Sequence, residues 1–158
     1  MIDRLPVTLA FKALLADLTG FPVGVRTVPL DEATGLPVPP PYTVLDPLDH
    51  PDDDGTLADT GSAAISGYQA TFVSGPVPGV PDSRGGDDQS QLLADRGRRV
   101  VERPTDGSTG YTHPLTLPDG IDCWHREARE AGGTSEANDA IITSVIRYRL
   151  FLAEDATA

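Results

Sequence analysis

The sequence predicts an α+β fold in which two helices pack on one face of a mainly antiparallel sheet. Three observations lead to this prediction. An apolar stripe with helical spacing lies near the start of the chain, a second helical segment lies near its middle, and several segments alternate between apolar and polar residues. The 158 residues include 16 glycines and 15 prolines, so we expect long irregular loops around a small core. A chain of this length fits a single domain over residues 1–158.

The first predicted helix begins near Pro6, a residue that suits the first helical turn. Its apolar side chains recur at the spacing that places them on one helical face. Gly20 and Pro22 end the helix, because neither residue continues a helix favourably. The apolar face consists of Val7, Phe11, Leu14, Leu15 and Leu18.

Three strands are expected before the second helix. Residues 23–30 read as a short strand, and residues 42–45 form another that Pro47 stops. Residues 66–74 alternate, so that one face of this strand is apolar. That face carries Tyr68, Ala70 and Phe72.

The second helix is predicted over residues 88–103. Asp88 and Gln91 have the spacing of a capping box, which places the helix start at Asp88, and Pro104 ends the helix. Acidic residues at its start and arginines near its end complement the helix dipole. The side chains expected to face the sheet are Leu93, Gly97, Val100 and Val101.

Two more strands complete the sheet. Residues 121–129 form one, with Trp124 on one face and Cys123 and His125 on the other. Residues 141–153 alternate clearly, with Arg147 and Arg149 opposite an apolar face. That apolar face consists of Ile142, Ile146, Tyr148, Leu150 and Leu152.

The remaining segments are predicted as loops. Residues 46–64 carry six aspartates without any periodicity and form a long acidic loop. Residues 75–87 and 105–120 are two further loops, and residues 131–140 interrupt the last two strands.

The order of these elements resembles that of the tail-terminator proteins of long-tailed (siphovirus-type) bacteriophages. The resemblance is carried by the first helix, a Pro-Pro-Tyr strand that starts at Tyr42, a Tyr-Gln-Ala-Thr strand from Tyr68, and the helical segment Ala94-Asp95-Arg96. It spans residues 6–152 and agrees with the predicted fold. It implies a structural virion protein, with no enzymatic activity and no cofactor.

The resemblance also implies partners and a location. The chain would assemble with itself into a hexameric ring that caps the tail tube and joins the tail to the head connector. Its partners would be the tail tube protein and the head–tail connector or adaptor protein. It would lie at the neck of the virion after assembly in the host bacterial cytoplasm.

Composition narrows the classes of function. The net charge of −12, with a single lysine at Lys12, argues against binding nucleic acid over the whole surface, so DNA is expected only as passing cargo. An acidic ring lumen would let DNA slide without holding its phosphates. Cys123 is the only cysteine, which excludes an intrachain disulfide. No stretch reaches the length of a membrane span, and no signal peptide is visible, so we expect a soluble protein.

Three features of the sequence could in principle carry chemistry. The acidic loop around His50 offers oxygen ligands, but it lacks the alternation and the final Glu of a calcium-binding EF-hand. Cys123 and His125 lack any sign of an activated thiol, and the glycine-rich segments lack the Gly-Lys-Ser/Thr of a phosphate-binding loop. The alternatives are another neck component, such as an adaptor or tail-completion protein, a small metal-dependent hydrolase using the His50 loop, or a monomeric binding module.

No catalytic, cofactor or metal site is therefore predicted. The residues expected to face the ring lumen or a neighbouring ring are Asp52, Asp53, Asp54, Arg96, Arg98 and Arg99.

Overall fold

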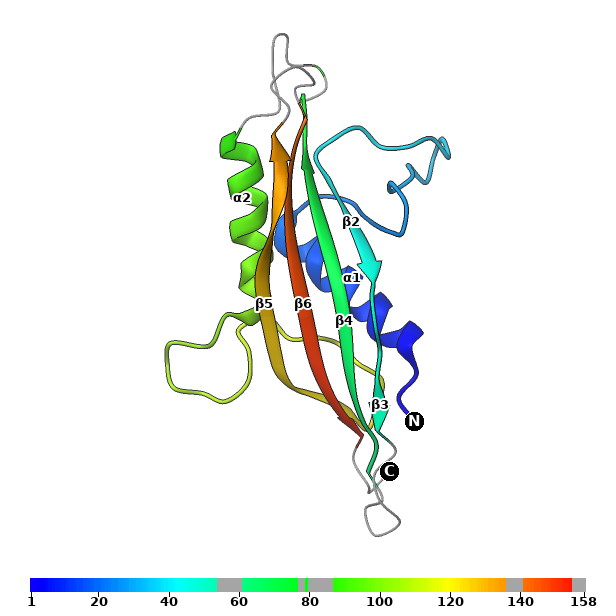
Figure 1. Cartoon of the computed structure of the whole chain (residues 1–158), viewed down its shortest axis with the longest axis vertical. Coiled ribbons are helices and arrows are strands. Elements are labelled where there is room, and N and C mark those ends of the chain that lie inside the picture. Colours follow the sequence, from blue (N-terminus) through cyan, green and yellow to red (C-terminus); the bar gives the residue numbers. More distant parts are fainter. Residues whose placement is uncertain (54–60, 77–78, 80–86, 136–140, 155–158) are drawn as a thin grey trace.

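The computed structural model describes residues 1–53, 61–76, 79, 87–135 and 141–154, and within these ranges it confirms the predicted α+β fold. Two helices lie on one face of an open, mainly antiparallel sheet (Figure 1). The elements are α1 (Arg4–Thr19), β1 (Val23–Val25), β2 (Tyr42–Pro47), β3 (Asp52–Asp53), β4 (Ala63–Ser74), α2 (Asp87–Arg98), the 3-10 helix η1 (Arg99–Val101), β5 (Ile121–Ser135) and β6 (Ile142–Glu154).

The sheet has the strand order β1-β2-β4-β6-β5, and β3 pairs with β4 beyond the end of β2. Among the strand pairs of the described residues, only β1–β2 is parallel. The strands β4 and β6 form the centre and pair along almost their whole length, with Tyr68 directly opposite Tyr148. This register places the apolar side chains of both strands on the same face, as predicted.

The helix α1 agrees with the predicted stripe. Its residues Val7, Phe11 and Leu15 are fully buried, whereas Leu18 is partly buried. Gly20 ends the helix in the left-handed conformation, at φ 74°, and its N–H donates to the carbonyl oxygen of Ala16. Glycine adopts this conformation without the steric cost that other residues incur.

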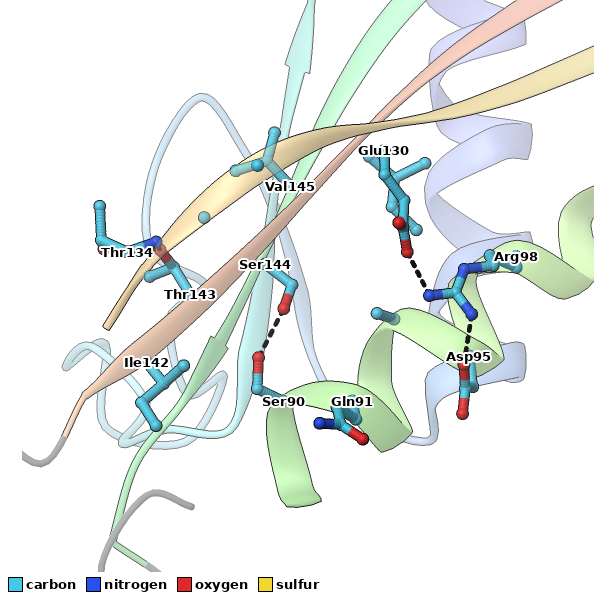
Figure 2. A pocket seen from close by; sticks show the side chains of 14 residues that line it. Ser90, Gln91, Asp95, Arg98, Glu130, Thr134, Ile142, Thr143, Ser144 and Val145 are labelled. Atoms are coloured by element: carbon cyan, nitrogen blue, oxygen red, sulfur yellow. Dashed lines mark hydrogen bonds and ion pairs between the residues drawn. The ribbon is translucent and has the colours of Figure 1, made fainter. Parts of the chain in front are cut away.

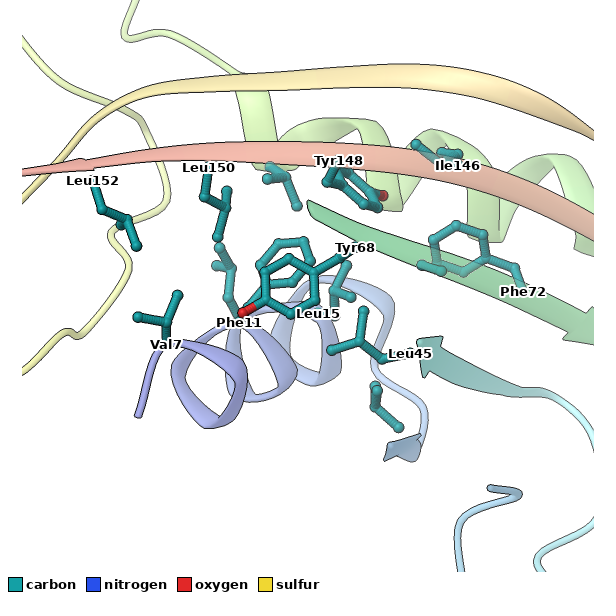
Figure 3. Close-up of a cluster of buried hydrophobic side chains, with 14 of the residues drawn as sticks. Val7, Phe11, Leu15, Leu45, Tyr68, Phe72, Ile146, Tyr148, Leu150 and Leu152 are labelled. Carbon is teal, nitrogen blue, oxygen red and sulfur yellow. The ribbon is translucent and has the colours of Figure 1, made fainter. Parts of the chain in front are cut away.

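The core lies between the two helices and the sheet (Figure 3). The ring of Phe11 packs against the rings of Tyr68 and Tyr148, at centroid distances of 5.0 and 5.1 Å. The hydroxyl groups of Tyr68 and Thr8 form a hydrogen bond of 3.0 Å, so the buried phenol is not left without a partner. Phe72, Leu93, Ile146, Tyr148 and Leu150 belong to the same buried cluster as the apolar residues of α1.

The helix α2 differs from the prediction at both ends. It begins at Asp87, so Asp88 lies inside the helix and is not its N-cap. It ends at Arg98, and residues 99–101 continue as the tighter helix η1 before Pro104. Gly97 and Val100 face the core, as expected.

Two further expectations are wrong in their boundaries. The segment 46–64 is not one continuous loop, because β2 continues through Pro47 and β3 pairs with β4. The strand β5 continues to Ser135 through a stretch that was expected to interrupt it. A register shift between Glu130 and Gly133 accommodates this glycine-rich part of the strand.

Candidate functional site

The face of the sheet opposite the helices is a candidate surface, and we call it the open face. It is the face that is turned away from α1 and α2 (Figure 1), and it carries alternate side chains of β4, β5 and β6. The strand register arranges these side chains in rows across the sheet. One row holds Ile65, Phe151 and His125, the next holds Gly67, Arg149 and Glu127, and the third holds Gln69, Arg147 and Arg129.

The first row of the open face is apolar and aromatic. Trp124 is 58% exposed and packs against Phe151 and His125, at centroid distances of 5.5 and 5.8 Å. Beside this cluster lies a shallow hollow of about 260 Å³. The residues around it are Pro51, Asp52, Ala63, Ala64, Ile65, Trp124, Phe151 and Leu152. An exposed tryptophan beside an apolar hollow is typical of a protein contact surface.

The two other rows are charged. Arg149 and Glu127 form an ion pair of 3.5 Å, and Arg147 donates from Nε to the amide oxygen of Gln69 at 3.2 Å. Arg129 is exposed, and within the described part of the chain it has no hydrogen bond or ion pair. The guanidinium groups of these rows therefore have donors that make no contact within the described part of the chain.

Gly67 lies in the second row, beside the segment that follows β2. A Cβ atom at this position would lie 2.5 Å from a carboxylate oxygen of Asp49, an exposed side chain that can turn aside, and 3.4 Å from the backbone oxygen of Asp49. A second hollow of about 610 Å³ opens here, bounded by Asp49, Arg147 and Arg149 among others. The two hollows share Ile65 and Pro51 in their linings.

A second apolar surface lies on the opposite side of the molecule. The outer side of α1 exposes Leu5 and Leu9, which are 68% and 52% exposed, together with Ala13. These three residues are four positions apart and form one stripe, which we call the outer stripe of α1. Asp17 continues the same line at the end of the helix and is exposed.

A polar groove of about 510 Å³ separates α2 from the hairpin of β5 and β6 (Figure 2). Arg98, one of the predicted contact residues, lies in this groove and forms ion pairs with Asp95 at 2.5 Å and with Glu130. The hydroxyl groups of Ser90 and Ser144 form a hydrogen bond of 2.5 Å across its floor. The groove is thus closed by contacts within the chain, and its arginine is already paired.

The other predicted contact residues are dispersed. Arg96 donates to the carbonyl oxygen of Thr19 at 2.7 Å and thereby caps α1, whereas Arg99 lies exposed in η1. Asp52 is exposed on β3 at the edge of the apolar hollow. The backbone of Asp53 pairs with Ala63, and Asp54 lies outside the described residues.

The surroundings of His50 bear on the alternative of a metal-dependent enzyme. His50 uses both ring nitrogens, one with the Ser66 hydroxyl at 2.6 Å and one as a donor to the Ile2 carbonyl at 3.0 Å. Among the described residues, no three His, Cys, Asp or Glu side chains are grouped as metal ligands would be. His50 therefore ties the start of α1 to the sheet.

The expectation that Cys123 and His125 share a face is wrong. A bulge makes Trp124 an extra residue in β5, so that Cys123 pairs with Leu152 on the helix side and His125 pairs with Phe151 on the open face. Burial raises the pKa of the Cys123 thiol, and the nearby Arg126 offsets this only in part. A raised pKa disfavours the thiolate that a nucleophile needs.

Arg126 holds the loop before β5 in place. It is buried, and its guanidinium donates to the carbonyl oxygens of Val100 and His113 at 3.1 and 2.8 Å. Its backbone N–H donates to the Tyr111 hydroxyl at 2.6 Å, and its guanidinium lies 4.3 Å from the Tyr111 ring centre. Tyr111 therefore covers part of the exposed edge of β5.

Sequence reasoning missed both the aromatic row and the outer stripe of α1. A signal for the stripe was present, because Leu5, Leu9 and Ala13 are apolar and lie outside the core-facing positions of the helix. The aromatic row had no such signal, since it depends on a bulge and on the pairing of two distant strands.

Comparison with models of known protein families and with curated protein sequences finds no match. Across the described ranges, the helices are too short or too polar to cross a lipid bilayer.

Proposed function

We propose that this chain is a structural subunit of a phage neck, which assembles into a ring that caps the tail tube and joins the tail to the head connector. The observation that supports this most directly is the presence of two different exposed apolar surfaces on opposite sides of one two-layer domain: the aromatic row at Trp124 and the outer stripe at Leu5 and Leu9. A chain with two such surfaces can bind a copy of itself head to tail, and contacts of that kind generate rings when the rotation closes.

The fold is compatible with the proposal in two further respects. The order of helices and strands is the one that the tail-terminator resemblance implies. The loops at both ends of the sheet can reach neighbouring rings, since the chain between Val25 and Tyr42 and the chain between Val101 and Ile121 contain no helix or named strand.

The location can be tested on assembled particles. Chemical cross-linking of purified virions, followed by mass spectrometry, should join this chain to the tail tube protein on one side and to the connector on the other. Deletion of its gene should leave tails that fail to join heads. Neighbours found only at the head vertex would instead support the adaptor alternative. Absence of the chain from virions would contradict both.

A further inference from the structure

We propose that the ring interface is formed by the outer stripe of α1 of one copy seated on the open face of the next copy, with Leu5 and Leu9 in the apolar hollow at Trp124 and Phe151. This inference rests on the proposed function, because it names the contact by which copies of the chain would form the ring. The occupant of the open face is thus a second copy of this chain.

The first argument is that both surfaces are apolar and that, among the residues the structure describes, both leave large apolar side chains exposed. Leu5 and Leu9 are the most exposed leucines of α1. Trp124 is the most exposed aromatic side chain among the described residues. The hollow beside Trp124 is lined mainly by apolar side chains, which include Ile65 and Phe151. Burial of two such surfaces against each other is favourable in proportion to the apolar area removed from water.

The second argument is that both surfaces lie at the same end of the molecule. His50 bonds to the carbonyl oxygen of Ile2, just before α1, and stands two residues before β3. The first residue of β3, Asp52, pairs with Ala64, which in turn pairs with Leu152. The start of α1 and the end of β6 therefore lie together, as Figure 1 also shows.

The third argument is the order of charges along the two surfaces. Moving away from that end, the outer stripe of α1 presents Leu9, then Ala13, and Asp17 continues the same line. In the same direction, the open face presents the aromatic row, then the row in which Glu127 is paired with Arg149, then the row with Arg129 and Arg147. Apolar side chains would thus meet apolar ones, and the aspartate would meet arginines.

The distances between these side chains along α1 and along β6 also agree. From Leu9 to Asp17 the helix rises about 12 Å, at 1.5 Å for each residue. From Phe151 to Arg147 the strand spans about 13 Å, at about 3.3 Å for each residue. A helix laid along β6 with Leu9 at Phe151 would therefore bring Asp17 to the row of Arg147.

The charge of the open face favours a protein partner over a nucleic acid. Its exposed aromatic side chains and its arginines would suit a single nucleic-acid strand, which binds by stacking and by phosphate contacts. However, Asp49, Asp52 and Glu127 lie among the arginines and would repel phosphates. A surface of alternating charge is better matched by another surface of alternating charge.

Disulfide trapping tests the contact directly. In a Cys123→Ser background, a chain that carries both Leu9→Cys and Phe151→Cys should form a ladder of covalent multimers on mild oxidation, and the ladder should end at the size of the ring. Equimolar mixing of the two single variants should give dimers that contain one of each. The matched control is Leu92→Cys with Phe151→Cys, since Leu92 is exposed on α2 and should give no ladder.

Charge reversal provides the second measurement. Asp17→Arg and Arg147→Asp should each weaken self-association by roughly two- to fivefold in sedimentation velocity, as the loss of an exposed ion pair does. The double variant should restore association, because each reversed face then meets its complement. Both positions are exposed, so circular dichroism should remain unchanged.

The outcomes separate this inference from the proposed function. A ring that forms normally without the Leu9–Phe151 cross-link would overturn the inference and leave the proposed function standing. Leu9→Cys that cross-links to itself would also overturn it, since that result requires a two-fold contact. A cross-linked ring that is absent from phage tails would support the interface and overturn the proposed function.

Discussion

The hydroxyl group of Tyr148 donates a hydrogen bond of 2.9 Å to the carbonyl oxygen of Gly97, and this contact joins β6 to α2 through the core. A Cβ atom on Gly97 would lie 2.5 Å from Cζ of Phe72 and 2.9 Å from the Tyr148 hydroxyl. Both of these side chains are fully buried and cannot move aside. Glycine at this position therefore sets how closely α2 approaches the sheet.

We expect Gly97→Ala to destabilise the protein. Alanine favours the helix by up to about 1 kcal/mol relative to glycine, but overpacking of a core costs about 1–3 kcal/mol. The net loss in the free energy of unfolding should be roughly 1–2 kcal/mol in urea denaturation. Leu92→Ala, on the exposed side of α2, is the control and should change stability by less than about 0.5 kcal/mol. A Gly97→Ala protein as stable as wild type would mean that α2 lies farther from the sheet.

Alkaline pH should destabilise the fold through Tyr148. Burial raises the pKa of its hydroxyl above the ordinary value of 10.0, so the unfolded chain ionises first. The stability contributed by the neutral tyrosine is fully present below about pH 10 and is lost as the pH rises further, by up to about 1.4 kcal/mol for each pH unit. The free energy of unfolding should therefore fall as the pH rises above about 10.

The variant Tyr148→Phe isolates this effect. It should be less stable at neutral pH by about 0.5–1.5 kcal/mol, because it loses the hydrogen bond to Gly97. Its decline above pH 10 should be shallower than that of the wild type, although burial also raises the pKa of Tyr68, which still contributes. Equal slopes for the two proteins would show that Tyr148 ionises as readily in the fold as in the unfolded chain.

Two leucines of α1 should respond very differently to truncation. Leu15 is fully buried, so Leu15→Ala should cost about 2–5 kcal/mol of unfolding free energy, as other core truncations do. Leu5 is 68% exposed in the single chain, so Leu5→Ala should change the stability of the monomer by less than about 0.5 kcal/mol. Denaturation at low protein concentration measures both, and a large effect of Leu5→Ala there would mean that its side chain packs inside the monomer.

The fold could be predicted to a large extent because its elements carry strong local patterns. The stripe of Val7, Phe11 and Leu15 and the alternation from Ile142 to Glu154 have the periods of a helix and a strand, and these periods fix which side chains are buried. Neighbouring residues alone determine such patterns. The side chains on the core side of the sheet and of α1 could therefore be predicted from the sequence.

The open face could not be predicted in the same way. Pairing between strands that are far apart in the sequence aligns Ile65, Phe151 and His125 in one row. No local sequence pattern encodes that register. The bulge at Trp124 also exchanged the faces of the residues around it. The arginines of α2 illustrate the same limit, since Arg96 turned out to cap α1.

The acidic residues Asp52, Asp53 and Asp54 remain predicted to face the ring lumen or an adjoining ring, and to bind no metal. Three adjacent carboxylates repel one another, and a buried, unpaired placement would be costly, so they must lie in water or against arginines. Asp52 is indeed exposed, at the edge of the hollow that the neighbouring copy would fill.

Replacement of all three by Asn separates the two placements. If they line the lumen, rings should assemble normally while DNA passage is disturbed, because phosphates are then repelled less. If they dock against a neighbouring ring, the joint between tail and connector should weaken, which the fraction of headless tails in electron micrographs measures. Metal found in the wild-type protein by elemental analysis, and lost from the variant, would contradict both.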